Sequence, residues 1–573
     1  MSTIQQLITE HMDIWTAADT GKRSGRGRAS SNAGSVYGVK KLRELILELA
    51  VCGRLVPQDA NDEPASELLK RIKAEKAKLV AEGKIKKEKP LAPITDDEKL
   101  FELPHGWVLV RNCELFQLRK GRIPKSLNED ELGLPYLDID ALDRNIIRRY
   151  SEELTCPQST DKDILVVCDG SRSGLVLDGK NGIIGSTLSI IDTPVFIQNY
   201  IKLIFKQGFE IFNTSMKGAA IPHLDTQKLL QNPTALPPLA EQHRIVAKVD
   251  ELMALCDQLE AQYSNAAEAH EKLVSHLLGT LTQSQSADDF SANWQRITAH
   301  FDMLFTTEAS LDALKQTLLQ LAVMGKLVPQ DPKDEPASEL LKRIQAEKAK
   351  LVADGKIKKD KPLAPIGEDE KPFELPENWE WVRLGHSLLK ITDGTHHSPP
   401  NLDNGAFKYI SAKNIKSWGL DLSDITYITK DMHEEIYSRC NPELGDVLYI
   451  KDGATTGIAT INTLEEPFSM LSSVALLKPS VGTNNQFLLK AMTAPFFYAE
   501  MRSEMTGVAI TRVTLAKLNN AVIPLPPLAE QHRIVAKVDE LMALCDQLKT
   551  GITAANQQQQ AIADSLVAQA VTA

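Results

Sequence analysis

The sequence LPPLAEQHRIVAKVDELMALCDQL occupies residues 236–259 and recurs without a change at residues 525–548. In each copy a Pro-Pro pair leads directly into an amphipathic run. The apolar positions after Ile245 and Ile534 are spaced alternately by four and three residues, which is the pattern of a coiled-coil seam. We therefore predict a long helix in each half of the chain, and we expect the two helices to pack against each other in a pseudo-symmetric molecule. The residues expected to pair them are Ile245, Val249, Leu252, Leu259, Ile534, Val538, Leu541 and Leu548.

A second repeat lies earlier in each half. Residues 49–94 and 321–366 are identical at 39 of 46 positions, and both contain EPASELLKRI, AEKAKLVA and KIKK. Ser66 and Ser338 are expected to cap a lysine-rich helix or to lie in its first turn. The positive face of this helix could lie on DNA or on a partner subunit, and a solvated lysine face is the alternative.

Between the repeats, each half contains a variable segment that does not resemble its counterpart. Short runs such as DILVVCDG and GDVLYIKDG are rich in Val and Ile, which predicts strands joined by tight turns. We predict an α+β fold with two mixed α/β domains, separated by long helices that pair as an antiparallel coiled coil, and with an internal pseudo-two-fold repeat. The expected divisions are an N-terminal segment and linker (1–35), a helical repeat (36–104), a first variable domain (105–235), a central helix (236–284), linking helices with the second helical repeat (285–376), a second variable domain (377–524) and a C-terminal helix (525–573).

Composition narrows the class of protein. The 573 residues carry a net charge of −11, so any nucleic-acid binding must come from local basic patches and not from the total charge. The seven cysteines are scattered without metal-like spacing, which fits a reducing cytosol. No run approaches the roughly 18 apolar residues of a membrane span.

This organisation resembles the specificity subunit of Type I restriction–modification enzymes. The resemblance covers nearly the whole chain. It is carried by the duplicated PLPPLAEQHRIV corner and helix, by the paired divergent segments, and by ITDGTHHSPP (391–400) and GVAITRVTLAKLNN (507–520).

The resemblance implies that the variable segments are target recognition domains, each recognising one half of a bipartite site in double-stranded DNA. It implies that the helices hold these domains at a fixed separation and dock two modification subunits, in a bacterial or archaeal cytoplasm. S-adenosylmethionine for adenine methylation, and ATP and Mg, are expected on the modification and restriction subunits. No catalytic residue, cofactor or metal is expected on this chain. A helix from about residue 528 to about residue 570 is roughly 64 Å long, long enough to separate half-sites by one to two DNA turns of about 34–36 Å each.

Three pairs of glycine-containing loops fall at matching places in the two variable domains. They are residues 117–126 and 390–399, DGSRSG (169–174) and DGATTG (452–457), and MKGAAIPHL (216–224) and MTGVAITRV (505–513). Glycine permits close backbone approach, and the side chains between the glycines are where base recognition could vary. Candidate DNA contacts are Arg119, Lys120, Arg122, Arg172 and Lys217 in the first domain and Thr395, His396, His397, Lys451, Thr455, Thr456 and Arg512 in the second.

Several apparent enzyme motifs fail. The run from Gly174 to Asn181 nearly spells a phosphate-binding loop, but Asn181 replaces the Ser or Thr that would hold Mg²⁺, and DGKNG indicates a hairpin turn. We find neither an amino-methyltransferase motif nor a nucleophile–base constellation, which argues against a self-sufficient methyltransferase or nuclease. The remaining alternative is a structural coiled-coil adaptor whose two variable domains bind proteins.

Overall fold

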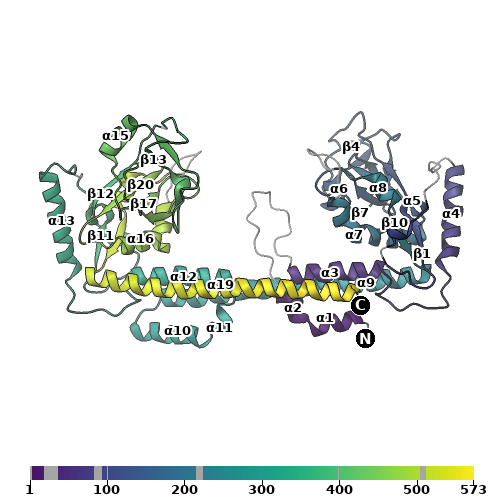
Figure 1. The fold of residues 1–573 in the computed structure, drawn as a ribbon, viewed down its shortest axis with the longest axis horizontal. Coiled ribbons are helices and arrows are strands. Elements are labelled where there is room, and N and C mark those ends of the chain that lie inside the picture. The colour runs from purple at the N-terminus through teal and green to yellow at the C-terminus, as the bar shows by residue number, and fades with distance from the viewer. Residues whose placement is uncertain are drawn as a thin grey trace. The chain divides into compact units, whose positions relative to one another are not determined.

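The computed structural model describes residues 3–17, 36–82, 93–99, 101–214, 223–359, 361–397, 399–503 and 512–572. These residues form two compact units (Figure 1). Unit 1 contains residues 1–266 and 555–573, and unit 2 contains residues 267–554. The two long helices α9 (Leu239–Thr282) and α19 (Leu528–Thr572) each contribute residues to both units. The long helix predicted after each repeated corner is thus confirmed.

Unit 1 contains one α/β domain and a helical frame. Its other elements are α1 (Thr3–Glu10), α2 (Met12–Ala17), α3 (Tyr37–Val51), α4 (Ala65–Ala81), η1 (Asp96–Glu98), β1 (Val108–Arg111), α5 (Asn112–Leu115), β2 (Gln117–Lys120), β3 (Leu134–Leu137), α6 (Ile139–Asp143), β4 (Tyr150–Ser151), β5 (Gln158–Ser159), β6 (Ile164–Val167), β7 (Val176–Asp178), β8 (Gly182–Ile184), β9 (Leu188–Asp192), η2 (Val195–Ile197), α7 (Gln198–Thr214), α8 (Thr226–Gln231) and β10 (Pro233–Leu236).

Unit 2 contains the second α/β domain and the second frame. Its other elements are α10 (Ala287–Ala299), α11 (Phe301–Leu304), α12 (Glu308–Val323), α13 (Ala337–Ala353), η3 (Glu368–Glu370), β11 (Glu380–Arg383), α14 (Leu384–Ser387), β12 (Leu388–Asp393), β13 (Phe407–Ile410), η4 (Ala412–Asn414), β14 (Ile415–Lys416), β15 (Gly419–Leu420), β16 (Thr426–Ile428), α15 (Lys430–Arg439), β17 (Val447–Ile450), β18 (Ala459–Ile461), β19 (Ser469–Met470), β20 (Val474–Pro479), α16 (Asn485–Thr493), α17 (Pro495–Ser503), α18 (Leu515–Asn520) and β21 (Val522–Leu525).

The two α/β domains share the strand order of their antiparallel sheet, while the second sheet has, among the described residues, four strands in the first domain and three in the second. A four-stranded antiparallel sheet runs β2-β9-β6-β7 in the first domain and β12-β20-β17-β18 in the second. The second sheet has one parallel pair in each domain, β3 with β8 and β13 with β19. The central strands β6 and β17 are buried at every position, which explains their continuous apolar sequences ILVV and VLYI.

Beneath each domain, the N-terminal turn of the long helix is fixed by a buried carboxylate. Trp107 Nε1 donates to Glu241 at 2.9 Å in unit 1, and Trp379 Nε1 donates to Glu530 at 2.9 Å in unit 2. Both carboxylates are 1% exposed, and this burial raises the pKa of each above the usual range. The same bond therefore ties the repeated FELP–Trp segment to the repeated helix in both units.

A second pair of matching contacts joins the start of each domain to its end. Arg111 pairs with Glu98 at 2.6 Å and donates to the carbonyl of Gln231. Arg383 likewise pairs with Glu370 at 2.6 Å and donates to the carbonyl of residue 520. The Arg111 guanidinium lowers the pKa of Glu98 to about 2, because it stabilises the ionised carboxylate. The repeat thus extends from the sequence to individual hydrogen bonds.

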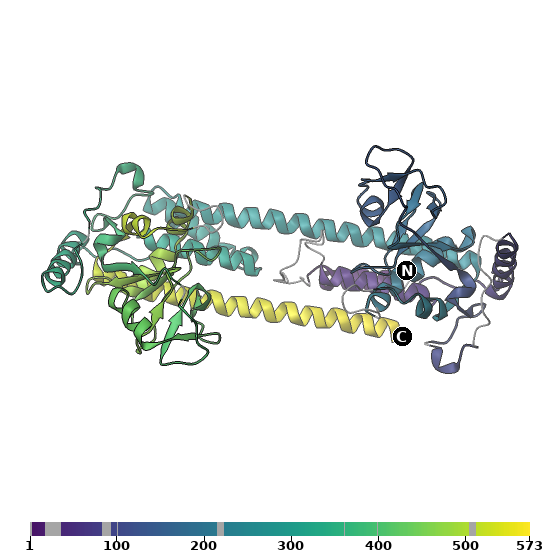
Figure 2. The same ribbon diagram turned by 90° about the horizontal axis from the view of Figure 1, so that it is seen from above.

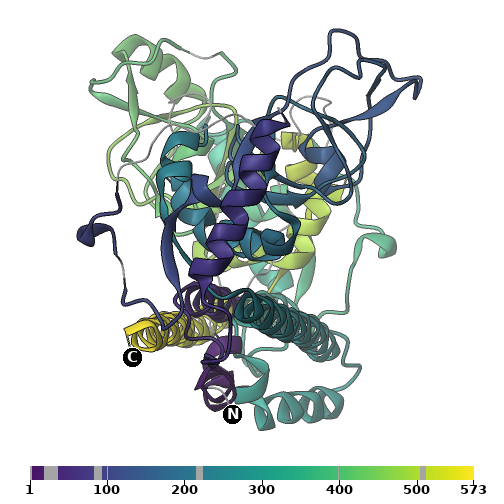
Figure 3. The same ribbon diagram turned by 90° about the vertical axis from the view of Figure 1, so that its right-hand side faces the viewer.

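The helical seam meets a third helix in each unit. Ile245, Val249, Leu252 and Leu259 are buried in one cluster with the apolar face of α3. In unit 1, α3 lies between α9 and the end of α19, as Figure 2 and Figure 3 show. Arg43 of this helix pairs with Asp257 and Glu260 of α9, and Tyr37 donates to Asp564 of α19. The seam pattern predicts that the long helices pack directly on each other, whereas in unit 1 α3 lies between them.

Unit 2 repeats this arrangement less completely. Ile534 and Val538 are buried with residues of α12, and Leu541 packs beside the same helix. Lys549 of α19 pairs with Asp312 of α12 at 2.9 Å. Leu548, however, is 42% exposed, so it does not close the seam as predicted.

A third repeat is formed by two pairs of short helices. α1 and α2 correspond to α10 and α11, with equivalent residues 289 positions apart. Ile8 and Ile297, one such pair, are 2% and 1% exposed. The identical residues are Gln6 and Gln295, Ile8 and Ile297, Thr9 and Thr298, His11 and His300, and Asp13 and Asp302. The frame is therefore longer than the two obvious repeats. Among the described residues, no helix is both long and apolar enough to cross a membrane.

Candidate nucleic-acid interface

The same turn follows the central strand of each domain, and we call it the DGxxxG turn (residues 169–174 and 452–457). Its first glycine has φ of +102° at Gly170 and +92° at Gly453, a conformation that favours glycine. The Ser173 and Thr456 hydroxyls close the turn by donating to the carbonyls of these glycines at 2.8 and 2.7 Å. The backbone is thus the same in both domains while the side chains at the tip differ.

Strand register identifies which side chains occupy equivalent places beside this turn. Lys120 lies opposite Ser189, and Asp393 lies opposite Ala475 on the corresponding strand. Directly after the central strand, the amides of residues 168 and 451 donate to the carbonyls of Thr187 and Ser473, the residues that directly precede β9 and β20. Lys120 of the first domain therefore corresponds to Asp393 of the second, and Cys168 corresponds to Lys451.

In the first domain, Asp169 collects two basic side chains. His223 Nδ1 lies 2.7 Å from one carboxylate oxygen, and Lys120 Nζ lies 3.5 Å from the other. The side chains of Lys120 and His223 are 60% and 54% exposed, whereas that of Asp169 is only 19% exposed. The carboxylate therefore orients two polar groups that remain open to a ligand.

The other first-domain candidates are arginines with acidic partners. Arg119 makes two bonds to Asp192, at 2.9 and 3.0 Å. Arg172, at the tip of the DGxxxG turn, pairs with Asp143 at 2.8 Å and holds the pKa of that carboxyl below its usual range. Arg122 approaches Glu153 at 3.2 Å. The side chains of Arg119, Arg172 and Arg122 are 43%, 41% and 56% exposed, so each can exchange its partner for a phosphate or a base edge. Lys217 lies outside the described residues.

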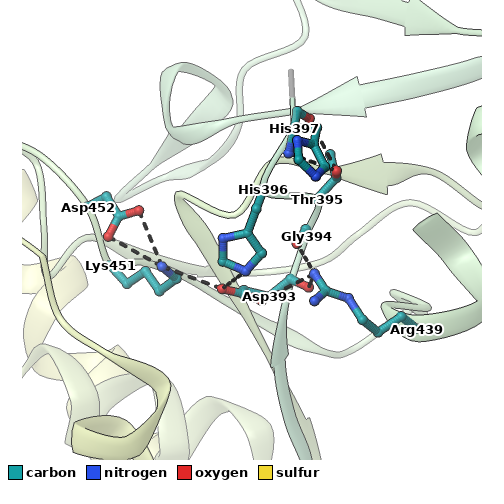
Figure 4. A network of polar contacts seen from close by, with 8 residues as sticks. All are labelled: Asp393, Gly394, Thr395, His396, His397, Arg439, Lys451 and Asp452. Carbon is teal, nitrogen blue, oxygen red and sulfur yellow. Dashed lines mark hydrogen bonds and ion pairs between the residues drawn. The ribbon is translucent and has the colours of Figure 1, made fainter. Parts of the chain in front are cut away.

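In the second domain, a buried carboxylate is the centre of the network in Figure 4. Asp393 is 2% exposed and lies 3.5 Å from Lys451 Nζ and 3.4 Å from His396 Nε2. Lys451 also pairs with Asp452 at 3.2 Å. Arg439 Nη2 lies 3.4 Å from the Asp393 carboxylate and donates to the Asp393 carbonyl at 3.0 Å. This network fixes the start of the loop that carries His396.

The second-domain candidates divide into interior and surface residues. Lys451 and Thr456 are 6% and 1% exposed, so they support the turn and do not face a ligand in this conformation. Thr455 and Arg512 are exposed. Within the loop that carries His396, Thr395 Oγ1 donates to the carbonyl of His397 and accepts from its amide.

Sequence reasoning missed Asp169, His223, Asp393 and Arg439. A signal for His223 was present, because aligning MKGAAIPHL with MTGVAITRV places it opposite the candidate Arg512. Asp169 and Asp393 were not selected because the candidates were chosen among basic, hydroxyl and histidine side chains, and not among the carboxylates that hold them in place.

The expected hairpin at DGKNG was wrong. β7 pairs only with β6 among the described strands, whereas β8 pairs with β3 and β5 in the other sheet. The segment therefore crosses between two sheets. Lys180 donates to the carbonyl of Ala141 at 2.7 Å, which is a structural contact within the domain.

Two variable surfaces on one duplicated frame define a protein that recognises two different targets. The family model described as the Type I restriction modification DNA specificity domain matches residues 104–269 and 376–556. The Type I restriction enzyme EcoAI specificity subunit of Escherichia coli is 41% identical over 597 residues, covering 99% of this chain and 100% of the relative. The EcoEI specificity subunit of Escherichia coli is 38% identical over 603 residues, covering 98% and 99%. A crystal structure of the HsdS subunit from Thermoanaerobacter tengcongensis is 19% identical, with a TM-score of 0.36, and the match covers 83% of this chain and 98% of that one.

The chain belongs to the family of Type I restriction–modification specificity subunits. The resemblance inferred from the repeated corner and the paired divergent segments is thus confirmed.

Proposed function

We propose that the two α/β domains bind the two halves of a split sequence in double-stranded DNA. The observation that carries this proposal is the DGxxxG turn, whose backbone is the same in both domains while its exposed tip carries Arg172 in one and Thr455 in the other. Constant backbone with variable side chains is what separate recognition of two sequences requires, because base edges are distinguished by side-chain donors and acceptors.

The helical frame supplies the second part of the proposal. α9 and α19 begin directly after the last strand of each domain, and each first turn is fixed by the Trp–Glu bond described above. When the junction between a domain and its helix is fixed, the length of the helix sets the position of that domain. We propose that these helices set the number of unrecognised base pairs between the half-sites and dock two modification subunits, with restriction subunits joining the complex.

The chemistry is assigned to those partners. S-adenosylmethionine for adenine methylation would be held by the modification subunits, and ATP with Mg by the restriction subunits, while this chain supplies sequence recognition. The alternative, an adaptor whose two domains bind proteins, gains no support from the exposed basic side chains that surround both turns.

The test is genome-wide mapping of N6-methyladenine in cells that express the modification subunit with and without this chain. We expect one split motif, two short halves around a fixed gap, to be methylated only when the chain is present. An unchanged methylation pattern, together with no salt-dependent binding of the assembled complex to DNA, would favour the adaptor.

A further inference from the structure

Residues 223 and 512 occupy the same fixed place beside the DGxxxG turn. His223 forms an antiparallel bridge with Asp169, and Arg512 forms one with Asp452. In each domain the next residue donates its amide proton to the end of the central strand at 2.8 Å, from Leu224 to Cys168 and from Val513 to Lys451. The backbone of this position is therefore set by the fold, and only the side chain differs between the domains.

The His223 ring is oriented by Asp169. An ionised carboxylate can only accept hydrogen bonds, so the 2.7 Å contact assigns the proton to Nδ1 of the ring. The backbone bridge and the side-chain bond hold the same two residues together, which restricts the ring more than a lone surface contact would. The second ring nitrogen, Nε2, is then available to a ligand on the exposed edge of the side chain.

The groups beside Asp169 are complementary to a base edge. In a neutral imidazole Nε2 is an acceptor, and the major groove offers exocyclic amino donors on adenine and cytosine. Lys120 Nζ, on the other oxygen of the same carboxylate, is a donor that suits guanine O6 and N7. Arg512, at the position of His223 in the second domain, has donors only, so the two domains present different chemistry from one backbone site.

We propose that His223 is a specificity-determining residue of the first domain, held by Asp169 as a positioning residue and acting beside Lys120 on a base edge of duplex DNA. The inference rests on the proposed function and deepens it by assigning one recognition position to one residue. A bare surface histidine would lack the fixed backbone bridge, the oriented ring and the equivalent position in the other domain.

The experiment uses the full chain assembled with its modification subunit. The wild-type complex and its variants methylate a pool of DNA duplexes in which the first half-site is randomised and the second is kept, and the methylated duplexes are sequenced. The variants are His223→Ala, His223→Arg, Asp169→Ala and Asp169→Asn. His105→Ala, which removes an exposed histidine elsewhere in unit 1, is the matched control. DNA binding of each complex is also measured over a range of salt concentrations.

We expect His223→Ala to lower discrimination about tenfold at a single base-pair position, within the range for loss of one base contact. His223→Arg should change the preferred base at that position. Asp169→Ala should affect the same position, and Asp169→Asn should be milder because its amide oxygen still accepts from Nδ1. The second half-site and the His105→Ala complex should behave as the wild type.

Other outcomes would overturn the proposal. A uniform loss of affinity with a shallower salt dependence would make His223 a phosphate contact, and an unchanged base preference would make it a surface residue; either overturns the proposal. If disruption by His223→Ala spread over the whole first half-site and His223→Arg did not restore a defined preference, the role would be structural, which also overturns it. A wild-type complex that recognised no split motif would instead contradict the proposed function itself.

Discussion

The frames of the two units repeat the same bonds at the base of each domain, whereas the residues beside their DGxxxG turns differ in the sign of their charges. Trp107–Glu241 and Trp379–Glu530 are the same bond at the same length. Beside the DGxxxG turn, in contrast, an exposed Lys120 corresponds to a buried Asp393. The duplication has kept the parts that hold each domain on its helix and has changed the residues around the turns.

The difference has a physical reason. A frame residue such as Arg383 contacts Glu370 and a backbone carbonyl of a distant segment, so a substitution there leaves several polar groups without partners. Around the turns, charged residues pair locally, and exchanging an acid and a base together keeps the charges balanced. The second domain uses Lys451 between Asp393 and Asp452, where the first places Cys168.

The largest difference in stability between equivalent substitutions is expected at positions 168 and 451. Lys451→Ala should lower the free energy of unfolding by about 3–5 kcal/mol, because it removes the buried cation between Asp393 and Asp452 and leaves Asp393 with the more exposed Arg439. Cys168→Ala, at the equivalent position, should cost only about 1 kcal/mol. Urea denaturation of both variants measures the difference. Equal small losses would show that the Lys451 charge does not hold the second turn.

A smaller difference in stability is expected in the two long helices, which both have leucine at the equivalent positions 259 and 548. Leu259→Ala should destabilise unit 1 by about 2–3 kcal/mol, since Leu259 is 8% exposed and packs with α3. Leu548→Ala should cost less than about 1 kcal/mol, because this leucine lines an open groove with Trp294. Thermal denaturation of the two variants distinguishes them. A larger loss from Leu548→Ala would mean that the groove is closed in solution.

The buried carboxylates predict a pH effect that should be the same in both frames. Burial raises the folded-state pKa of Glu241 and Glu530, so their stabilising contribution is present below the unfolded pKa of about 4.5 and is lost as pH rises through the folded value. Gln keeps an oxygen acceptor for the tryptophan but does not ionise.

We therefore expect Glu241→Gln and Glu530→Gln to gain stability relative to the wild type as pH rises above about 4.5. Urea unfolding at several pH values measures this trend. Glu98 provides a control of opposite sign, because its contribution is present above about 4.5 and is lost as pH falls toward its folded pKa of about 2. A pH-independent difference between either glutamine variant and the wild type would contradict the assignment.

The smallest effect on stability is expected at the tip of the first turn. Arg172→Ala should change the free energy of unfolding by no more than about 0.5 kcal/mol, as is usual for surface substitutions. If Arg172 contacts a phosphate, the slope of log K against log salt for DNA binding should become shallower by about 0.9. Thr455→Ala in the second domain is the matched variant, and it should leave the slope unchanged because threonine carries no charge to neutralise a phosphate.

The repeated sequences predicted the architecture well because periodicity and duplication are both local properties of the chain. The long helices after residues 236 and 525, the short strands and the paired turns at 169–174 and 452–457 follow from them, while most of the loop pair at 216–224 and 505–513 lies outside the described residues. The helix between the long helices was not predicted, because the spacing of apolar residues indicates that one face of a long helix is buried but does not indicate which element covers it. DGKNG was misjudged for a similar reason, since turn chemistry does not specify which strands pair.

The site was less predictable than the fold. Exposed basic residues were easy to select from loop sequences, but burial decides their role, and it placed Lys451 and Thr456 in the interior. The sequence alignment already places His223 opposite Arg512, but only the structure shows its bridge and side-chain contact with Asp169. Base recognition depends on side-chain orientation, which distant segments determine together.

Exchanging residues 105–235 for the corresponding segment of another family member tests the central claim most directly. The hybrid chain is assembled with the modification subunit, and its methylated DNA sites are sequenced beside those of the wild type. If the frame is constant and each domain recognises its own target, one half of the split motif should change while the other half and the gap remain. An unaltered motif, or the loss of both halves by a complex that still assembles, would contradict separate recognition by two domains on one duplicated frame.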